Sequence, residues 1–217
     1  YRLQLWVTSV IPALLLGMNV SFVAGYWPLP LDPTPLGFAL GFALLGWTLL
    51  DPPQRPARAV VVGYPHTSNW DALYGQLGQL ALGLNARWVG KDNLFRWPFA
   101  GFLRWLGGIP VDRRASRGFV AQMAAQFAAH PDFLLVMAPE GTRKLTAGWK
   151  SGFYRIALEA GVPLILTTVN YARREVGILA YVELSGDPDA DIATIAAHYA
   201  GRHGRNPELA SPIRWLD

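Results

Sequence analysis

Two long apolar stretches open the chain and carry almost no charge. The first covers residues 3–26, which exceeds the about 20 apolar residues needed to cross the hydrocarbon core of a membrane. The second covers residues 36–50, and Asp32 is the only formal charge in either stretch or in the proline-rich turn between them. The pattern predicts a two-helix anchor over residues 1–52. This pair either spans the membrane as a hairpin or dips into one leaflet, and a very apolar soluble helix pair is the alternative.

The rest of the chain, residues 53–217, alternates short apolar runs with segments of helical apolar spacing. This alternation indicates an α/β domain with a mixed, largely parallel sheet flanked by helices. The last two predicted strands can pair antiparallel, and the tail from residue 205 is predicted to be irregular. The predicted strands cover residues 59–64, 86–90, 109–111, 133–138, 163–169 and 176–184, and the predicted helices cover 70–82, 98–106, 115–129, 150–160 and 189–201.

Composition narrows the possible partners. The chain has no cysteine, which excludes disulfides, thiolate nucleophiles and thiolate metal sites. Its net charge is +4, and basic residues concentrate in residues 87–117, where the only acids are Asp92 and Asp112. Such a segment suits anionic lipid or a phosphorylated small molecule, whereas no motif supports a nucleic-acid partner. The basic residues of this segment are Arg87, Lys91, Arg96, Arg104, Arg113, Arg114 and Arg117.

The sequence Pro-His-Thr-Ser-Asn-Trp-Asp at residues 65–71 carries the strongest candidate chemistry. It joins a predicted strand to a predicted helix, so His66 should lie at the C-terminal edge of the sheet, where α/β folds place their sites. Ser68 or Asn69 can cap the helix, which puts Asp71 in its first turn. An imidazole that folds back onto this carboxylate is a general base. The structural alternative is an acid favoured at a helix start by the helix dipole alone.

Four further blocks follow in order. Lys91 comes just after a predicted strand, and the block at residues 107–114 combines a glycine pair with paired arginines that offer forked donors to phosphate. Residues 138–143, Ala-Pro-Glu-Gly-Thr-Arg, follow the strand predicted at 133–138 and so share the sheet edge of His66. An arginine there can bind a phosphate, although a salt-bridged turn gives the same pattern. The fourth block, Gly-Val-Pro-Leu-Ile at residues 161–165, opens a core strand.

Taken together, these blocks resemble the four motifs of the glycerolipid acyltransferases. They are His-x4-Asp, a glycine–proline–Asp–Arg block, Pro-Glu-Gly-Thr-Arg and Val-Pro-Leu-Ile, spread over about residues 59–170. The nearest group is the lysophosphatidate (1-acylglycerol-3-phosphate) acyltransferases, and the apolar N-terminal pair is also similar to that family's membrane motif.

The resemblance implies roles for individual residues. His66 would deprotonate the acceptor hydroxyl, which attacks an acyl thioester directly, and Asp71 would orient His66. Lys91 and Arg113 would assist with phosphate or with the thioester oxyanion. The block assigned to acceptor binding corresponds to Glu140, Gly141, Thr142 and Arg143, with Arg143 on the phosphate.

The resemblance also implies substrates and a location. The partners would be a lysolipid acceptor, acyl-CoA or acyl carrier protein as co-substrate, and membrane lipids, with no metal and no other cofactor. The positive charges of Arg2, Arg55 and Arg58 flank the apolar pair on one side, which suits an enzyme held at an inner or plasma membrane with its catalytic domain in the cytoplasm.

Three departures from the family pattern surround the acceptor region. Pro65 stands where many members have asparagine, Ala138 where phenylalanine is common, and Lys144 where serine often occurs. The acceptor can therefore be another lysolipid, such as a lyso-ornithine lipid. A thioester hydrolase and a lipid-binding protein without turnover remain rival classes. No Gly-x-Ser-x-Gly elbow supports a serine esterase, and Ser68 lies too close to His66 for good triad geometry.

Overall fold

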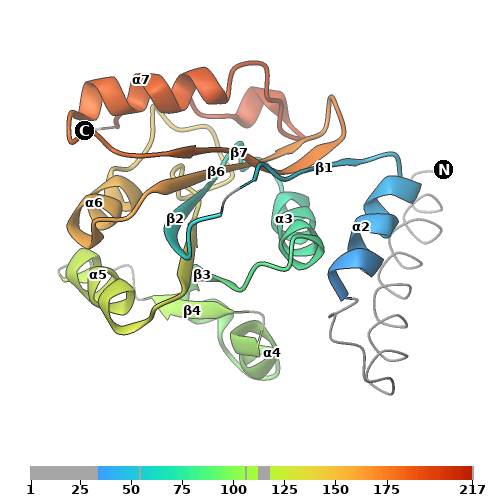
Figure 1. Ribbon diagram of the computed structural model, residues 1–217, viewed down its shortest axis with the longest axis horizontal. Helices are drawn as coiled ribbons and strands as arrows, with labels where there is room; N and C mark the ends of the chain where they lie inside the picture. The colour runs from blue at the N-terminus through green and yellow to red at the C-terminus, as the bar shows by residue number, and fades with distance from the viewer. Residues whose placement is uncertain (1–33, 54, 106, 112–117, 217) are drawn as a thin grey trace.

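The computed structural model describes residues 34–53, 55–105, 107–111 and 118–216 (Figure 1). The apolar helix predicted at residues 3–26 and the predicted site residue Arg113 lie outside them. The described elements are α2 (Thr34–Leu44), β1 (Thr48–Leu50), β2 (Arg58–Gly63), α3 (Asn69–Ala81), β3 (Ala86–Lys91), η1 (Asp92–Leu94), α4 (Ala100–Trp105), β4 (Gly108–Val111), α5 (Phe119–Ala129), β5 (Phe133–Met137), α6 (Gly152–Ala160), β6 (Leu164–Asn170), β7 (Glu175–Val182), α7 (Pro188–His198) and η2 (Pro207–Leu209).

Within the described part of the chain, seven strands form one sheet in the order β1-β7-β6-β2-β5-β3-β4. Strands β6, β2, β5, β3 and β4 are all parallel, whereas β7 runs antiparallel to β6 and β1 runs parallel to β7. The predicted mixed, largely parallel sheet and its antiparallel last pair are therefore confirmed. The C-terminal ends of β2, β5, β3 and β6 meet at one edge, where β7 and β1 begin.

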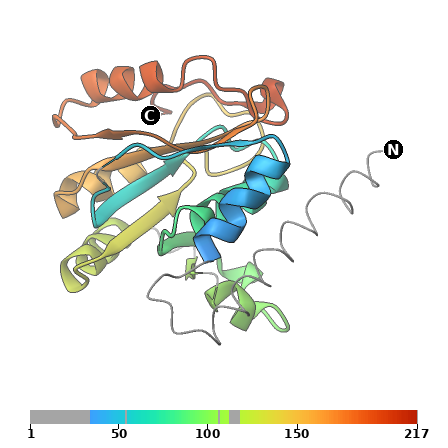
Figure 2. The same ribbon diagram turned by 45° about the vertical axis from the view of Figure 1, so that its right-hand side comes forward.

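Alternate side chains of the central strands enter two separate cores. Val60 and Val62 of β2 pack with buried residues of α5, α6 and α7, whereas Ala59 and Val61 face the opposite side of the sheet. Phe38 of α2 belongs to a third cluster, which also includes residues of α3, β6 and β7. The result is a three-layer arrangement, with α5, α6 and α7 on one face and α2 and α3 on the other (Figure 2).

The single helix predicted over residues 36–50 is wrong. Helix α2 ends at Leu44, because Gly46 adopts a left-handed conformation (φ +70°) that glycine tolerates and that stops a helix. Thr48 then donates its N–H to the carbonyl of Arg174, and β1 pairs with the start of β7. Backbone pairing with a distant strand therefore decides the structure of an apolar run that is also compatible with helix. None of the helices in the described ranges is long and apolar enough to cross a membrane.

We expect Gly177→Ala to destabilise the fold by about 2 kcal/mol or more, because strain and overpacking combine there. Gly177 of β7 has φ +131°, and an added Cβ would lie 2.2 Å from the carbonyl oxygen of Leu50 in β1. Gly186→Ala is the matched control, since its φ is +89° but an added Cβ meets no atom within 4 Å. Thermal unfolding followed by circular dichroism measures both. Equal losses for the two variants would contradict a specific clash with β1.

Candidate active site

Helix α3 begins with a capping box that also builds the candidate site. Ser68 is the N-cap residue, and its hydroxyl accepts a hydrogen bond from the N–H of Trp70 at 3.2 Å. In return, the Asp71 carboxylate accepts the N–H of Ser68 at 2.8 Å. This reciprocal arrangement satisfies backbone donors that a helix start would otherwise leave unpaired. The predicted positions of Ser68 as cap and Asp71 in the first turn are thus confirmed.

The Asp71 carboxylate is buried and accepts hydrogen bonds from three donors. Besides Ser68, the N–H of Thr67 donates to Oδ2 at 2.6 Å, and the Tyr171 hydroxyl donates to Oδ1 at 2.9 Å. Burial and contact with this carboxylate raise the pKa of the Tyr171 hydroxyl, so the group remains a proton donor at neutral pH. Asp71 is therefore held in one position by two consecutive backbone N–H groups of its own turn and by the hydroxyl of the residue that follows β6.

His66 faces this carboxylate and is partly open to solvent. Its Nδ1 lies 3.7 Å from Oδ2 of Asp71, and its side chain is 27% exposed, whereas that of Asp71 is 4% exposed. Burial lowers the pKa of the imidazole, the Asp71 carboxylate acts in the opposite direction, and the Arg143 guanidinium lowers it further. The net lowering favours the neutral imidazole at neutral pH. A neutral imidazole beside a carboxylate, with an accessible edge, is able to take a proton from a bound molecule.

Glu140 is a second buried carboxylate, and it fixes the backbone of His66. One of its oxygens accepts the N–H of His66 at 2.7 Å, and the other accepts the N–H of Ser211 at 2.9 Å. Its residue is only 1% exposed, and burial raises the pKa of its carboxyl group, although these N–H donors act in the opposite direction. In the described part of the chain, Glu140 forms no ion pair with Arg143, so the alternative of a salt-bridged turn is wrong.

The turn after Glu140 presents positive charge at the same edge. Gly141 has φ +66°, and a Cβ there would lie 3.2 Å from the ammonium nitrogen of Lys150, so that lysine lies directly over the turn. Thr142 is half-buried and accepts the N–H of Lys144 at 3.3 Å. Arg143 is exposed, and its effect on the pKa of His66 places it within electrostatic range of the imidazole. Arg143 and Lys150 thus supply two cations at this turn, and Arg143 is within electrostatic range of His66.

The remaining predicted residues are placed only in part. Lys91 is the last residue of β3, so its backbone lies at the sheet edge that carries His66 and Glu140. Arg113, as noted above, lies outside the described residues. Among the described residues, no group of three or more histidine, cysteine or acidic side chains is arranged to hold a metal ion.

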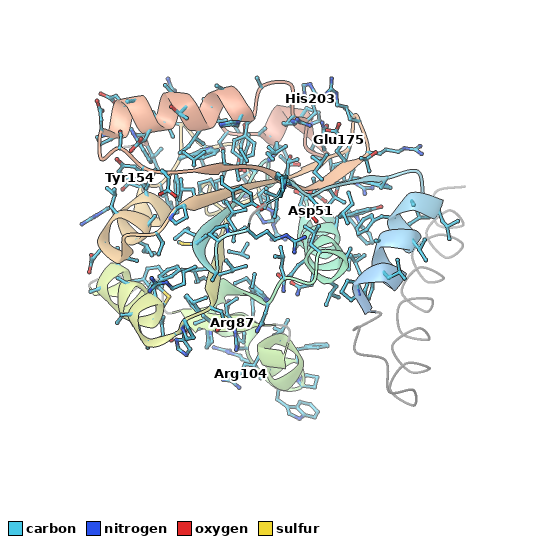
Figure 3. The ribbon with its side chains drawn as sticks, viewed as in Figure 1. Asp51, Arg87, Arg104, Tyr154, Glu175 and His203 are labelled. Atoms are coloured by element: carbon cyan, nitrogen blue, oxygen red, sulfur yellow. The ribbon has the colours of Figure 1, made fainter. Side chains whose placement is uncertain are left out.

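The C-terminal segment, predicted to be an irregular tail, contributes to the site. Asn206 donates its side-chain amide to the carbonyl of Thr67 at 3.0 Å, and Ser211 binds Glu140 as described. A Cβ on Gly204 would lie 2.6 Å from the Thr67 hydroxyl, so this close approach requires glycine. Asn170 at the end of β6 secures the same segment by bonding both Glu175 and the N–H of His203, two residues labelled in Figure 3.

These contacts are the ones that sequence reasoning missed. The position of Tyr171 could have been detected, because it lies two residues after the strand predicted at 163–169 and the parallel topology brings this strand end to the edge of His66. Asn206 and Ser211 offer no such signal, since nothing in the local pattern indicates which turn they approach.

Comparison with known proteins gives an independent assignment. The acyltransferase family model matches residues 51–169, which is more than half of the chain. Among solved structures, a 1-acyl-sn-glycerophosphate (LPA) acyltransferase, PlsC, from Thermotoga maritima is similar at 16% identity and a TM-score of 0.48, over 90% of this chain and 100% of that one. No curated protein sequence matches the chain. The family match spans His66, Asp71 and the turn at residues 140–143, and the chain belongs to the acyltransferase family.

Proposed function

We propose that this acyltransferase moves a fatty acyl group from an acyl thioester to the hydroxyl of a lysophospholipid-type acceptor, with 1-acylglycerol-3-phosphate as the leading candidate. Coenzyme A or acyl carrier protein would carry the acyl group. The observation that carries the proposal is the partly exposed imidazole of His66 beside the buried Asp71 carboxylate. The exposed Arg143 near this imidazole favours a phosphate-bearing acceptor, and a lyso-ornithine lipid is the alternative.

The proposed reaction needs only these two substrates. With Nδ1 of His66 directed at Asp71, Nε2 takes the proton from the acceptor hydroxyl as its oxygen attacks the thioester carbonyl carbon. The new C–O bond forms, and the C–S bond of the resulting tetrahedral species breaks. The thiolate leaves and takes the proton from the imidazolium. The products are an ester and a free thiol, without a covalent acyl-enzyme.

Three neighbouring groups would keep the base in place. Asp71 stabilises the imidazolium that forms when the proton arrives. Tyr171 holds Asp71 through its hydroxyl, and Glu140 holds the backbone of His66. Because both oxygens of Glu140 already accept N–H donors, we propose that it supports acceptor binding by positioning the turn at residues 140–143.

Cations of the same edge would bind the acceptor phosphate. Arg143 offers a planar fork that can grip two phosphate oxygens, and Gly141 and Thr142 shape the turn that presents it. Lys91 and Arg113 are proposed to assist with the phosphate or the thioester oxyanion, as the family resemblance implies. Lys150, which lies against Gly141, is placed to add charge at this position.

A membrane location follows from the proposed acceptor and the apolar N-terminal region. We propose that residues 1–52, whose last part also forms β1 of the sheet, anchor the α/β catalytic domain of residues 53–217 on the cytoplasmic side of an inner or plasma membrane. Leu36, Leu40 and Leu44 support this proposal, because they are 61%, 48% and 79% exposed along α2. Residues four apart on a helix share one face, so the three form an apolar stripe.

A thioester hydrolase and a lipid-binding protein are distinguished by one assay. Purified enzyme is mixed with acyl thioester, with and without lysolipid, and free thiol is measured together with the lipid product by mass spectrometry. Thiol release that depends on the acceptor supports acyl transfer. Release without acceptor indicates hydrolysis, and no release indicates binding alone.

His66→Ala should lower acyl transfer by about 10²–10⁴-fold, which is the usual loss when a general base is removed. Asp71→Asn should also lower the rate of acyl transfer steeply, since the neutral amide cannot stabilise an imidazolium. The fold should survive this change because the Tyr171 hydroxyl can turn to accept the new amide N–H. Steady-state rates and circular dichroism check both variants. A folded His66→Ala enzyme that keeps more than about a tenth of the wild-type rate would refute the mechanism.

Tyr171→Phe should shift the pH dependence of kcat/KM as well as lower the rate. Without the hydroxyl, the Asp71 carboxylate loses one donor and attracts the imidazolium more strongly, so the pKa of His66 should rise. The imidazole then stays protonated up to a higher pH, so the acidic limb of the kcat/KM profile should shift to higher pH. Tyr181→Phe is the control, because its hydroxyl donates to the carbonyl of Pro52 away from the site. An unmoved profile in Tyr171→Phe would reduce this contact to a purely structural one.

Arg143→Ala and Arg143→Lys should raise the KM for lysophosphatidate almost equally, because lysine keeps the charge but loses the fork. The donor KM should change little. With a dephosphorylated monoacylglycerol as acceptor, neither substitution should change the acceptor KM. Arg58→Ala, at the opposite edge of the sheet, is the matched arginine control. An equal rise in KM for both acceptors would contradict the phosphate assignment and indicate an uncharged or zwitterionic lysolipid.

A further inference from the structure

The segment between β3 and α4 exposes three large apolar side chains close together in the sequence. Leu94, Trp97 and Phe99 are 52%, 92% and 64% exposed. Isolated exposed apolar residues are common on protein surfaces, whereas a cluster of this kind usually marks an interaction site. We call residues 92–99 the apolar loop.

The apolar loop is held firmly in this position. Phe95 is buried, and its ring centroid lies 5.6 Å from that of Trp88 on β3. A Cβ on Gly108 of β4 would lie 2.7 Å from the same ring, so Phe95 fills a space that both strands leave for it. The N–H groups of Phe99 and Ala100 also donate to the carbonyl of Arg96, each at 3.0 Å. The anchored Phe95 therefore leaves its apolar neighbours on the outside.

The charge around the apolar loop is positive. Arg87, Arg96 and Arg104 are exposed, and Asp92 is the only acid in the described residues between 86 and 111. Figure 3 shows Arg87 and Arg104 at the α4 end of the molecule. Tryptophan together with arginine is the composition favoured at the membrane–water interface, where rings sit at headgroup level and cations attract anionic lipid.

The position of the apolar loop relates it to the active site. It leaves the C-terminal end of β3, and β3 is parallel to β5, which is parallel to β2. The loop therefore starts from the sheet edge that carries His66. In Figures 1 and 2, the N-terminal end of α2 lies on the same side of the molecule as α4, and this end carries the exposed Leu36.

We propose that the apolar loop inserts Trp97, Phe99 and Leu94 into the headgroup region of an anionic bilayer, with Arg96 and Arg104 on the lipid phosphates. This contact is additional to the anchor proposed for residues 1–52 and does not depend on which lipid accepts the acyl group. It turns the catalytic edge of the sheet toward the lipid. A bilayer fits better than an acidic protein, because three large apolar side chains and Arg96 are exposed together on this one loop.

The absence of cysteine from residues 1–217 permits a direct test with the whole of this chain. W97C, labelled with an environment-sensitive fluorophore, is bound to phosphatidylglycerol–phosphatidylcholine vesicles, and vesicle binding is verified by sedimentation. We expect a blue shift, higher intensity, and quenching by lipids that carry a nitroxide near the headgroup. L158C is the matched control, because Leu158 is an exposed leucine (42%) on α6, away from α4 in Figure 1. Its label should stay in water on the same vesicles.

A second set of variants tests the charge and guards against local misfolding. F99C should repeat the W97C result, and adding R96Q and R104Q to W97C should weaken the quenching most on anionic vesicles at low salt. A label at position 97 that remains in water on vesicle-bound enzyme would overturn the proposal. A label whose fluorescence changes when acyl carrier protein is added without vesicles would also overturn the proposal. Acyl transfer by W97C to detergent-dispersed acceptor should stay at the wild-type level, so this proposal can fail while the proposed function stands.

Discussion

The buried carboxylate of Asp71 is the constraint on which the site depends. A carboxylate taken out of water is costly unless its oxygens accept hydrogen bonds, and this one accepts two backbone N–H groups and the Tyr171 hydroxyl. The same bonds start helix α3. They also fix the position of the carboxylate that the His66 ring faces. Leaving one buried donor unpaired costs about 1–3 kcal/mol, so the first turn of α3 and the chemistry of His66 cannot vary independently.

Glu140 extends this constraint to the rest of the fold. Its two oxygens join the backbone of His66, from the β2–α3 turn, to that of Ser211, from the C-terminal segment. Glu140 follows the end of β5, and β5 lies beside β2 in parallel register, so Glu140 lies beside the turn that carries His66. The ring of His66 thus lies beside one buried carboxylate, and its backbone is held by another. Glu140 cannot turn toward a substrate without breaking the hydrogen bonds that hold the backbone of His66 and Ser211.

Sequence reasoning predicted what local patterns encode and failed where distant segments decide. The strands and helices from β2 to α7 follow periodicity, and the capping positions of Ser68 and Asp71 follow from residue type and spacing. The apolar run over residues 36–50 was misassigned because pairing with β7 makes its last part a strand. Asn206 and Ser211 could not be predicted, since their roles depend on which turn the tail approaches. The catalytic roles themselves stay a prediction.

The exposure of the site residues would allow one edge to serve both the water-soluble donor and the lipid acceptor proposed above. Asp71 and Glu140 are buried, whereas His66 is partly exposed and Arg143 is exposed. This environment already lowers the pKa of His66. Further burial under a lipid surface would lower the pKa again and keep the imidazole neutral, as a base requires. An acceptor drawn from the bilayer would then meet an uncharged base with the cations at its rim. The apolar loop beside this edge supplies the contact that would bring the two surfaces together.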